Sequence, residues 1–258
     1  MVVLGLDTTT KTGGMALHQA DGLEAVCIGD PMITHGERLP GDILEFLDEN
    51  KLTLGEIDRF AVVSGPGSFT GLRVGLATIQ ALALTNKKDV VAVPTLEAIV
   101  YAGIEEAKAL DEKTFLVPWM NAFRGEVFTG VYKRVNECSG SLRDDLAVHV
   151  VEVETPRVGK PAAMLKEWGS RLSLDDRQVV ILATESRQCD LGLEKVFGKQ
   201  ATWMIGTRSL ALTAARIGAG RIGDSRPVKP NHVRPVYIRR PDAVLARERR
   251  LKEQSSGE

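Results

Sequence analysis

Residues 64–75 form a glycine-rich stretch in which groups able to do chemistry lie close together. The stretch follows an apolar run and opens a segment with helical periodicity. Backbone N–H groups at the start of a helix have no helical partners and can bind an anion. Because no lysine precedes a serine or threonine here, the stretch is not a P-loop, and it predicts either an anion site or a tight strand-to-helix turn. The candidate signature loop consists of Gly65, Pro66, Gly67, Ser68, Phe69 and Thr70.

The first apolar run of the chain ends at a carboxylate that three hydroxyl side chains follow. This second candidate loop consists of Asp7, Thr8, Thr9 and Thr10. It resembles the first phosphate loop of actin-like ATPases, in which a carboxylate holds hydrated magnesium and hydroxyls approach phosphate. An aspartate at a strand end also serves as a plain turn former, and the four residues alone fit both interpretations.

Histidines and cysteines are few and widely spaced. No two histidines stand at a spacing that would place a metal-binding pair on one helix, and no two cysteines are close enough for a C-x-x-C site. Gly65 to Phe69 does not match the G-x-S-x-G pattern of a nucleophilic serine. The sequence therefore predicts no catalytic residue, no metal ligand and no cofactor. The residues concerned are His18, His35, His149, His232, Cys27, Cys138 and Cys189.

Alternating strands and helices must position these loops. Hydrophobic periodicity predicts strands over 2–6, 14–18, 23–28, 60–63, 90–93, 115–119, 126–132, 147–153 and 178–183. It predicts helices over 39–47, 70–84, 95–109, 161–168 and 209–217. The order suggests an α/β protein in which one βββαβα unit occurs twice, as in the actin-like (ASKHA) fold with two lobes. The expected parts are an N-terminal lobe over 1–110, a C-terminal lobe over 111–241 and a tail over 242–258.

Two of the expected helices carry more apolar and small residues than a surface helix needs. Glycines four residues apart, and Ala77 and Ala81 at the same spacing, would let another helix approach closely. The partner can be another helix of the same lobe or a second subunit, and the pattern does not decide between them. For an intersubunit contact we expect Gly75→Leu to fold and to lose association. The candidate partner interface consists of Leu39, Ile43, Phe46, Leu47, Gly71, Leu72, Arg73, Gly75, Leu76 and Ile79.

Charge is unevenly distributed along the 258 residues. The whole chain has a net charge of -1, which gives no general attraction to nucleic acid or membranes. Residues 207–252, however, hold twelve Lys/Arg against three Asp/Glu. These cations could meet RNA phosphates, although only Tyr237 among them could stack on a base, or they could form a solvated surface or a partner contact. The candidates are Arg226, Lys229, Arg234, Arg239 and Arg240.

Five blocks of the sequence resemble the TsaB (YeaZ) family, and together they extend over nearly the whole chain. The blocks are residues 4–10, 65–75, 93–98, 124–128 and 235–239. The resemblance implies an actin-like fold and makes the Asp7–Thr10 loop a vestige of a nucleotide site. The chain departs from the family pattern at residues 121–124, where Asn-Ala-Phe-Arg stands in place of an Asp-Ala-Arg run. That departure weakens the case for a nucleotide or metal site in the second lobe.

The resemblance also implies a biological role. It implies a cytoplasmic, non-catalytic subunit that pairs with the catalytic paralogue TsaD, works with the small ATPase TsaE, and forms a homodimer when alone. TsaD transfers threonylcarbamoyl to adenosine 37 of transfer RNAs that read codons starting with adenine, so this chain would meet tRNA only through the complex. The absence of a signal peptide or apolar 20-residue run fits that location. The rival interpretations are a stand-alone actin-like ATPase or carbamoyl-transfer enzyme, and a peptidase.

Overall fold

A computed structural model describes residues 1–107, 110–135, 149–172, 177–184, 196, 201–206, 209–220, 222 and 226–239. The tail expected over 242–258 lies outside these residues, as does Arg240. Within the described ranges, no helix combines the length and the apolar character that crossing a membrane requires.

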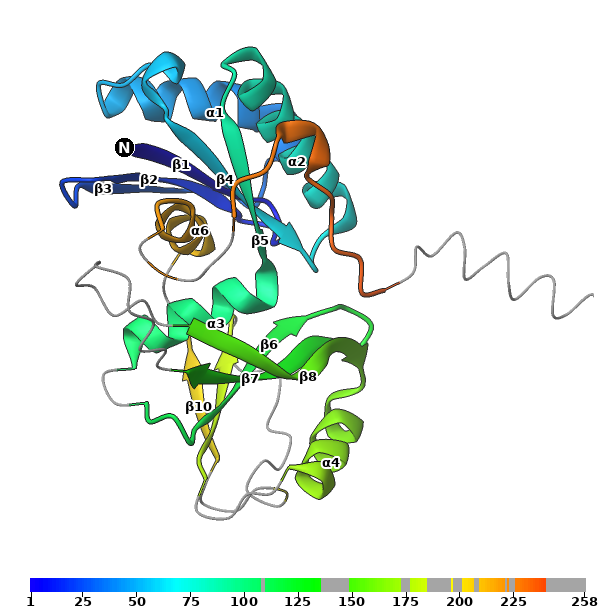
Figure 1. The fold of residues 1–258 in the computed structure, drawn as a ribbon. Coiled ribbons are helices and arrows are strands. Elements are labelled where there is room, and N and C mark those ends of the chain that lie inside the picture. The colour runs from blue at the N-terminus through cyan, green and yellow to red at the C-terminus, as the bar shows by residue number, and fades with distance from the viewer. Residues whose placement is uncertain are drawn as a thin grey trace, which may run out of the picture.

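The first sheet has five strands, in the order β3-β2-β1-β4-β5. The strands are β1 (Val2–Asp7), β2 (Gly14–Gln19), β3 (Glu24–Ile28), β4 (Arg59–Gly65) and β5 (Asp89–Pro94). Helices α1 (His35–Glu49) and α2 (Phe69–Thr85) cover its outer face (Figure 1). A short 3-10 helix over Leu54–Glu56 leads into β4. The apolar side chains of both helices join those of the sheet in one buried cluster.

The second sheet repeats this arrangement, in the order β10-β9-β6-β7-β8. Its strands are β6 (Phe115–Asn121), β7 (Val127–Val135), β8 (His149–Gly159), β9 (Val179–Ala183) and β10 (Ala201–Ile205). Helix α4 (Pro161–Arg171) buries Leu165 and Trp168 against it. In both sheets the first strand of the unit lies in the centre, antiparallel to the second and parallel to the fourth. The expected α/β fold of actin-like type is confirmed.

Two helices lie between the sheets, and each packs on the sheet of the other half. Helix α6 (Leu210–Gly218) contacts β1, β2 and β4 of the first sheet, whereas α3 (Thr95–Glu106) contacts β6, β7 and β9 of the second (Figure 1). A Cβ added at Gly5 of β1 would overlap the carbonyl oxygen of Ala211, so α6 lies directly on the strand. The lobe boundaries at 110 and 241 stay predictions, and this exchange means that neither half contains all of its own core.

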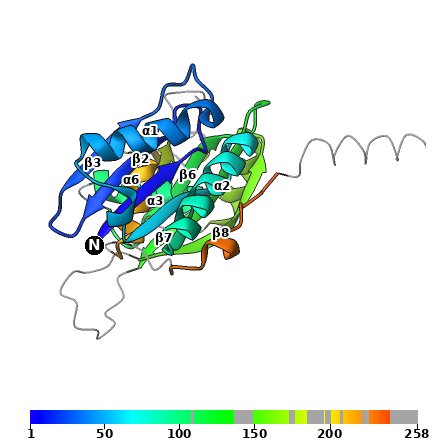
Figure 2. The same cartoon turned by 90° about the horizontal axis from the view of Figure 1, so that it is seen from above.

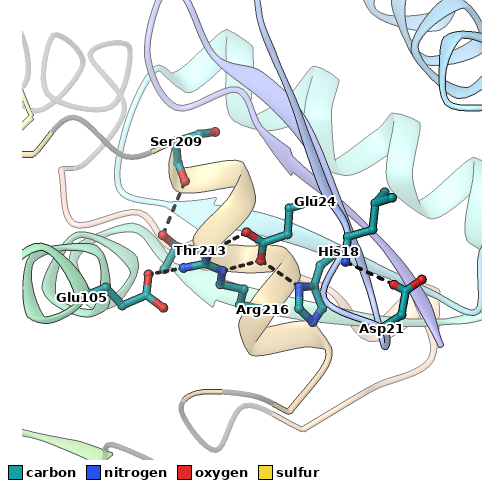
Figure 3. A network of polar contacts seen from close by, with 8 residues as sticks. His18, Asp21, Glu24, Glu105, Ser209, Thr213 and Arg216 are labelled. Atoms are coloured by element: carbon teal, nitrogen blue, oxygen red, sulfur yellow. Dashed lines mark hydrogen bonds and ion pairs between the residues drawn. The ribbon is translucent and has the colours of Figure 1, made fainter.

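An arginine network joins α6 to the first sheet and to α3 (Figure 3). Arg216 donates from Nε and Nη2 to the two carboxylate oxygens of Glu24, at 2.7 and 2.6 Å. Its Nη1 donates to Glu105 at 2.6 Å, and His18 Nδ1 lies 2.9 Å from the Glu24 carboxylate. The hydrogen bonds from Arg216 lower the pKa of Glu24 to about 2, against the opposing effect of partial burial. A second contact between the halves joins Arg59 Nη1 to the carbonyl oxygen of Gly218, at 2.6 Å.

The last described part of the chain, residues 226–239, returns to the first sheet and follows α2 (Figures 1 and 2). We call it the C-terminal segment. Val228 forms an isolated antiparallel bridge with Val90, and a 3-10 turn follows over Pro230–His232. The Gln80 amide of α2 donates to the carbonyl oxygens of Pro230 and Val233, at 2.9 and 3.2 Å.

The C-terminal segment ends in contact with the second half. The Val236 amide donates to the carbonyl oxygen of Ser64 at 2.8 Å. Arg239 Nη1 donates to the carbonyl oxygen of Ala122 at 2.6 Å, and its Nη2 pairs with the Glu126 carboxylate. The segment therefore connects the end of β4 to the β6–β7 turn.

We predict that the Arg216–Glu24 contact stabilises the fold in a pH-dependent way. The folded pKa of Glu24 is lowered from 4.5 to about 2, so its contribution is complete above pH 4.5 and is lost as pH falls toward 2. Glu24→Gln should reduce the free energy of unfolding at pH 7 by roughly 2–3 kcal/mol, and by less at pH 3. Urea denaturation at both pH values measures this difference. Glu45→Gln, at an exposed position on α1, is the control, and an equal loss at both pH values for Glu24→Gln contradicts the prediction.

Candidate functional site

The carboxylate of Asp7 is buried and accepts hydrogen bonds from its own loop. Its Oδ1 accepts from the Thr9 amide at 2.8 Å and from the Thr9 hydroxyl at 2.6 Å. The residue is 5% exposed, and this burial raises the pKa of the carboxyl, with the Thr9 hydrogen bonds acting in the opposite direction. One carboxylate oxygen of the predicted loop is therefore occupied from within the protein.

Helix α1 holds the same loop from one side. His35 Nε2 lies 2.9 Å from the carbonyl oxygen of Thr10, and Arg38 Nη2 donates to the carbonyl oxygen of Thr12 at 2.8 Å. Arg38 Nη2 also lies 3.0 Å from His35 Nδ1. Because arginine only donates, Nδ1 must accept and Nε2 must carry the proton that binds Thr10. His35 is thus a residue that positions the loop.

Helix α2 and the turn before it hold the loop from the other side, where three glycines, Gly67, Gly71 and Gly75, lie against it. The Ser68 amide donates to the carbonyl oxygen of Thr9 at 2.8 Å. A Cβ added at Gly71 would overlap the carbonyl oxygen of Thr8, and one at Gly75 would overlap the Thr8 hydroxyl. A Cβ at Gly67 would lie 2.5 Å from that of Thr9. The glycine spacing therefore permits close packing of α2 on the Asp7–Thr10 loop.

The start of α2 has the geometry of a tight turn. Ser68 Oγ accepts from the Gly71 amide at 3.2 Å and caps the helix. Gly65 has a φ of 114°, which side chains rarely adopt, and it precedes a cis peptide bond to Pro66. The amides of Ser68 and Gly71 have acceptors within the protein. This geometry favours the turn interpretation of the signature over the anion site.

The structure corrects the predicted partner interface. Nine of its ten residues are buried in the first lobe, and Arg73 is the exception. The apolar side chains of α1 and α2 pack on the first sheet and on each other. These side chains therefore cannot themselves contact a partner. The expectation that Gly75→Leu folds normally is wrong for the same reason, because a side chain there would overlap Thr8. The buried nine are Leu39, Ile43, Phe46, Leu47, Gly71, Leu72, Gly75, Leu76 and Ile79.

The opposite sides of α1 and α2 are exposed, and part of this surface is apolar or small, although α1 also exposes four acidic residues. Leu44 and Leu84 are each 57% exposed, and a Cβ added at Gly41 would meet nothing within 4 Å. The only sequence signal for this face was the spacing of its two alanines. We call it the outer helix face. It consists of Pro40, Gly41, Leu44, Ala77, Ala81 and Leu84.

A cavity of about 200 Å³ lies between the two halves of the chain. Asp7, Thr10 and Gly13 line it from the first sheet, whereas Leu182 and Ser209 line it from the second half. Ligand pockets usually measure roughly 300–1,000 Å³, so this cavity is small for a nucleotide. Among the residues that the structure describes, no three His, Cys, Asp or Glu side chains converge on a point where a metal ion could bind.

The departure from the family pattern at residues 121–124 lies on the β6–β7 turn. Asn121 Oδ1 accepts from the Phe123 amide at 2.8 Å, so the side chain shapes the turn. Phe123 and Arg124 both have positive φ, at 59° and 57°. The asparagine retains the turn-forming oxygen of an aspartate without its charge.

Comparison with known proteins assigns this geometry to a family. Residues 32–169 match the family described as TsaD: tRNA N6-adenosine threonylcarbamoyltransferase. The tRNA threonylcarbamoyladenosine biosynthesis protein TsaB of Bacillus subtilis is 27% identical over 80% of this chain and 80% of its own length. TsaB of Escherichia coli is 25% identical over 93% of this chain and 95% of its own. The solved structure of YeaZ from Pseudomonas aeruginosa has a TM-score of 0.63 at 21% identity, covering 92% and 99% of the two chains. The resemblance to TsaB (YeaZ) is confirmed.

We predict opposite effects for alanine at two helical glycines. Gly75→Ala should lower the free energy of unfolding by about 1–3 kcal/mol, because its Cβ overlaps Thr8 in a packed core. Gly41→Ala should raise it by about 0.5–1 kcal/mol, since the site is open and alanine favours the helix. Urea denaturation of both variants is the measurement. A Gly75→Ala variant as stable as the parent would show that α2 does not depend on this close approach.

Proposed function

This chain belongs to the family described as TsaD: tRNA N6-adenosine threonylcarbamoyltransferase, and we propose that it acts in that pathway as a non-catalytic partner subunit. The observation that carries the proposal is the match to two TsaB proteins over most of each chain. Both are named for the biosynthesis of threonylcarbamoyladenosine in tRNA. In the proposed pathway the product is formed on adenosine 37 of tRNAs that read codons starting with adenine.

The state of the Asp7–Thr10 loop supports a non-catalytic role. In an actin-like ATPase this loop would meet phosphate and hydrated magnesium. Here one oxygen of the Asp7 carboxylate is bound by Thr9, and backbone carbonyls of the loop are bound by His35, Arg38 and Ser68. The loop is used to assemble the lobe, which favours a scaffold over a stand-alone ATPase or carbamoyl-transfer enzyme.

The outer helix face is the surface that we propose for the partner. Exposed small residues on two adjacent helices allow two helices of another subunit to approach closely. A paralogue of the same fold, of the TsaD type, would present equivalent helices. A second copy of this chain would use the same face around a two-fold axis, so homodimer and heterodimer would compete. The TsaE-type ATPase would join this complex in the cytoplasm.

Reconstitution tests the proposed role. We predict that threonylcarbamoyl transfer to tRNA requires this chain together with the TsaD-type and TsaE-type proteins of the same organism. The isolated chain should neither modify tRNA nor hydrolyse ATP, because Thr9 occupies one oxygen of the Asp7 carboxylate and the loop packs against α2. Mass spectrometry of digested tRNA and a phosphate-release assay are the readouts. ATP turnover by the isolated chain that disappears in Asp7→Ala would favour the rival ATPase.

Two Ala→Arg variants test the proposed face. Ala77→Arg should fold, because the position is exposed, and should lose association with both the TsaD-type partner and itself, because a long charged side chain blocks close helix contact. Ala162→Arg on α4 makes the same change at an exposed helical position of the second lobe and should associate normally. Analytical ultracentrifugation measures association, and circular dichroism confirms folding. Normal pairing of a folded Ala77→Arg variant would place the interface elsewhere.

A further inference from the structure

Two aromatic rings and an arginine form an exposed cluster where the C-terminal segment meets the start of α2. The ring centroids of Phe69 and Tyr237 are 5.2 Å apart. The Arg73 guanidinium lies 4.0 Å from the Phe69 ring centroid, and its Nε donates to the Tyr237 hydroxyl at 3.3 Å. Both aromatic residues are 39% exposed, so ring surface remains open to solvent.

The surface around this cluster is cationic. Residues 226–239 contain four Lys/Arg and no Asp/Glu, and Arg73 is the one charged residue of α2. Two of the four cations form ion pairs with carboxylates. Arg226 and Arg234 form none with the described residues, and neither does Arg73. Three exposed guanidinium groups are therefore left without a neutralising carboxylate in the described part of the chain.

The cations and one of the rings belong to a segment that runs beside α2. The C-terminal segment follows α2 (Figures 1 and 2), with Pro230 and Val233 at Gln80 and Tyr237 at Arg73. In the sequence of this segment, Arg226 and Arg234 precede Tyr237. Gln80 comes seven positions after Arg73 in α2, so the two residues are about 10 Å apart along the helix axis. A flexible chain with regularly spaced negative charges could lie along this edge and reach both the arginines and the rings.

We propose that this edge binds a single-stranded segment of RNA, with phosphates on Arg73, Arg226 and Arg234 and a base stacked on the Phe69–Tyr237 pair. Stacking on aromatic rings beside cations is how proteins hold single strands without reading their sequence. The proposal rests on the proposed function, which places the chain in a pathway that modifies tRNA, and it names the part of the chain that touches the nucleic acid.

The composition of the edge sets the strength of binding. Phosphate contacts without base readout give dissociation constants of roughly 1–100 µM at physiological salt. The binding should also depend on salt. With three phosphate contacts to a single strand, a plot of the logarithm of the association constant against the logarithm of the salt concentration should have a slope of about -2. Such weak binding becomes sufficient when a partner protein holds the same RNA molecule, because the effective concentration of the RNA at this edge is then much higher. Productive contact with tRNA is then confined to the complex.

Fluorescence anisotropy of the full chain with a labelled, unstructured RNA of about 12 nucleotides tests the proposal, with DNA of the same sequence alongside. Tyr237→Ala should weaken RNA binding about fivefold or more, whereas Tyr237→Phe keeps the ring and should stay within about twofold. Arg226→Gln should reduce the salt slope by about 0.7. Arg171→Gln, an exposed arginine on α4, is the matched control and should change nothing.

Several results would overturn the proposal. They are salt-independent or absent RNA binding, equal affinities of Tyr237→Ala and Tyr237→Phe, and tighter binding of DNA than of RNA. If Tyr237→Ala loses the TsaD-type partner and keeps its RNA affinity, the edge is a protein contact. The RNA-binding test and the reconstitution can fail independently of each other. The chain can bind RNA and fail to support tRNA modification, or it can support tRNA modification without binding RNA.

Discussion

Gly71 and Gly75 on one side of α2, with Gly67 just before the helix, let the backbone lie against the Asp7–Thr10 loop at a distance that no side chain would permit. From the other side, His35 and Arg38 of α1 bind carbonyl oxygens of the same stretch. The loop after the central strand is therefore enclosed by both outer helices. The positions of α1 and α2, and hence of the outer helix face, depend on this contact. A loop that could serve a ligand in a related fold is here part of the lobe's own assembly.

Much of the fold could be predicted from the sequence, because strong periodicity marks most of its elements. The strands of the first half and the helices over α2 and α6 lie close to their expected ranges. β10 was missed, since Ala201–Ile205 is short and shows no clear alternation. β8 runs over His149–Gly159, well beyond the expected end at 153. The charged residues of this strand are exposed or partly exposed, and its apolar pattern is correspondingly weak.

The candidate site was harder to predict, because a pattern of apolar residues does not say whether that side of a helix meets its own sheet or a partner. Leu72, Leu76 and Ile79 were expected to face a partner, and they form the core of the first lobe instead. The glycine spacing correctly indicated a close approach to α2. The group that approaches is Thr8 of the same chain, which lies against Gly71 and Gly75, and not a helix of a partner. Likewise, Tyr237 looked isolated in the sequence, and only the folded chain places Phe69 beside it.

Exchange of helices between the halves connects the two lobes, which agrees with the scaffold role that we propose. An actin-like ATPase closes its two lobes around a nucleotide, so the lobes must be able to move apart. Here Arg216 joins β3 to α3, Arg59 binds the end of α6, and the C-terminal segment connects β4 to the β6–β7 turn through Arg239. Opening the cleft would break the contact of Arg216 with Glu105 and those of Arg239 with the β6–β7 turn, and a hydrogen bond to a charged group contributes about 1.5–3 kcal/mol. A fold held closed in this way presents its outer surfaces, the helix face and the basic edge, in a fixed relation to each other.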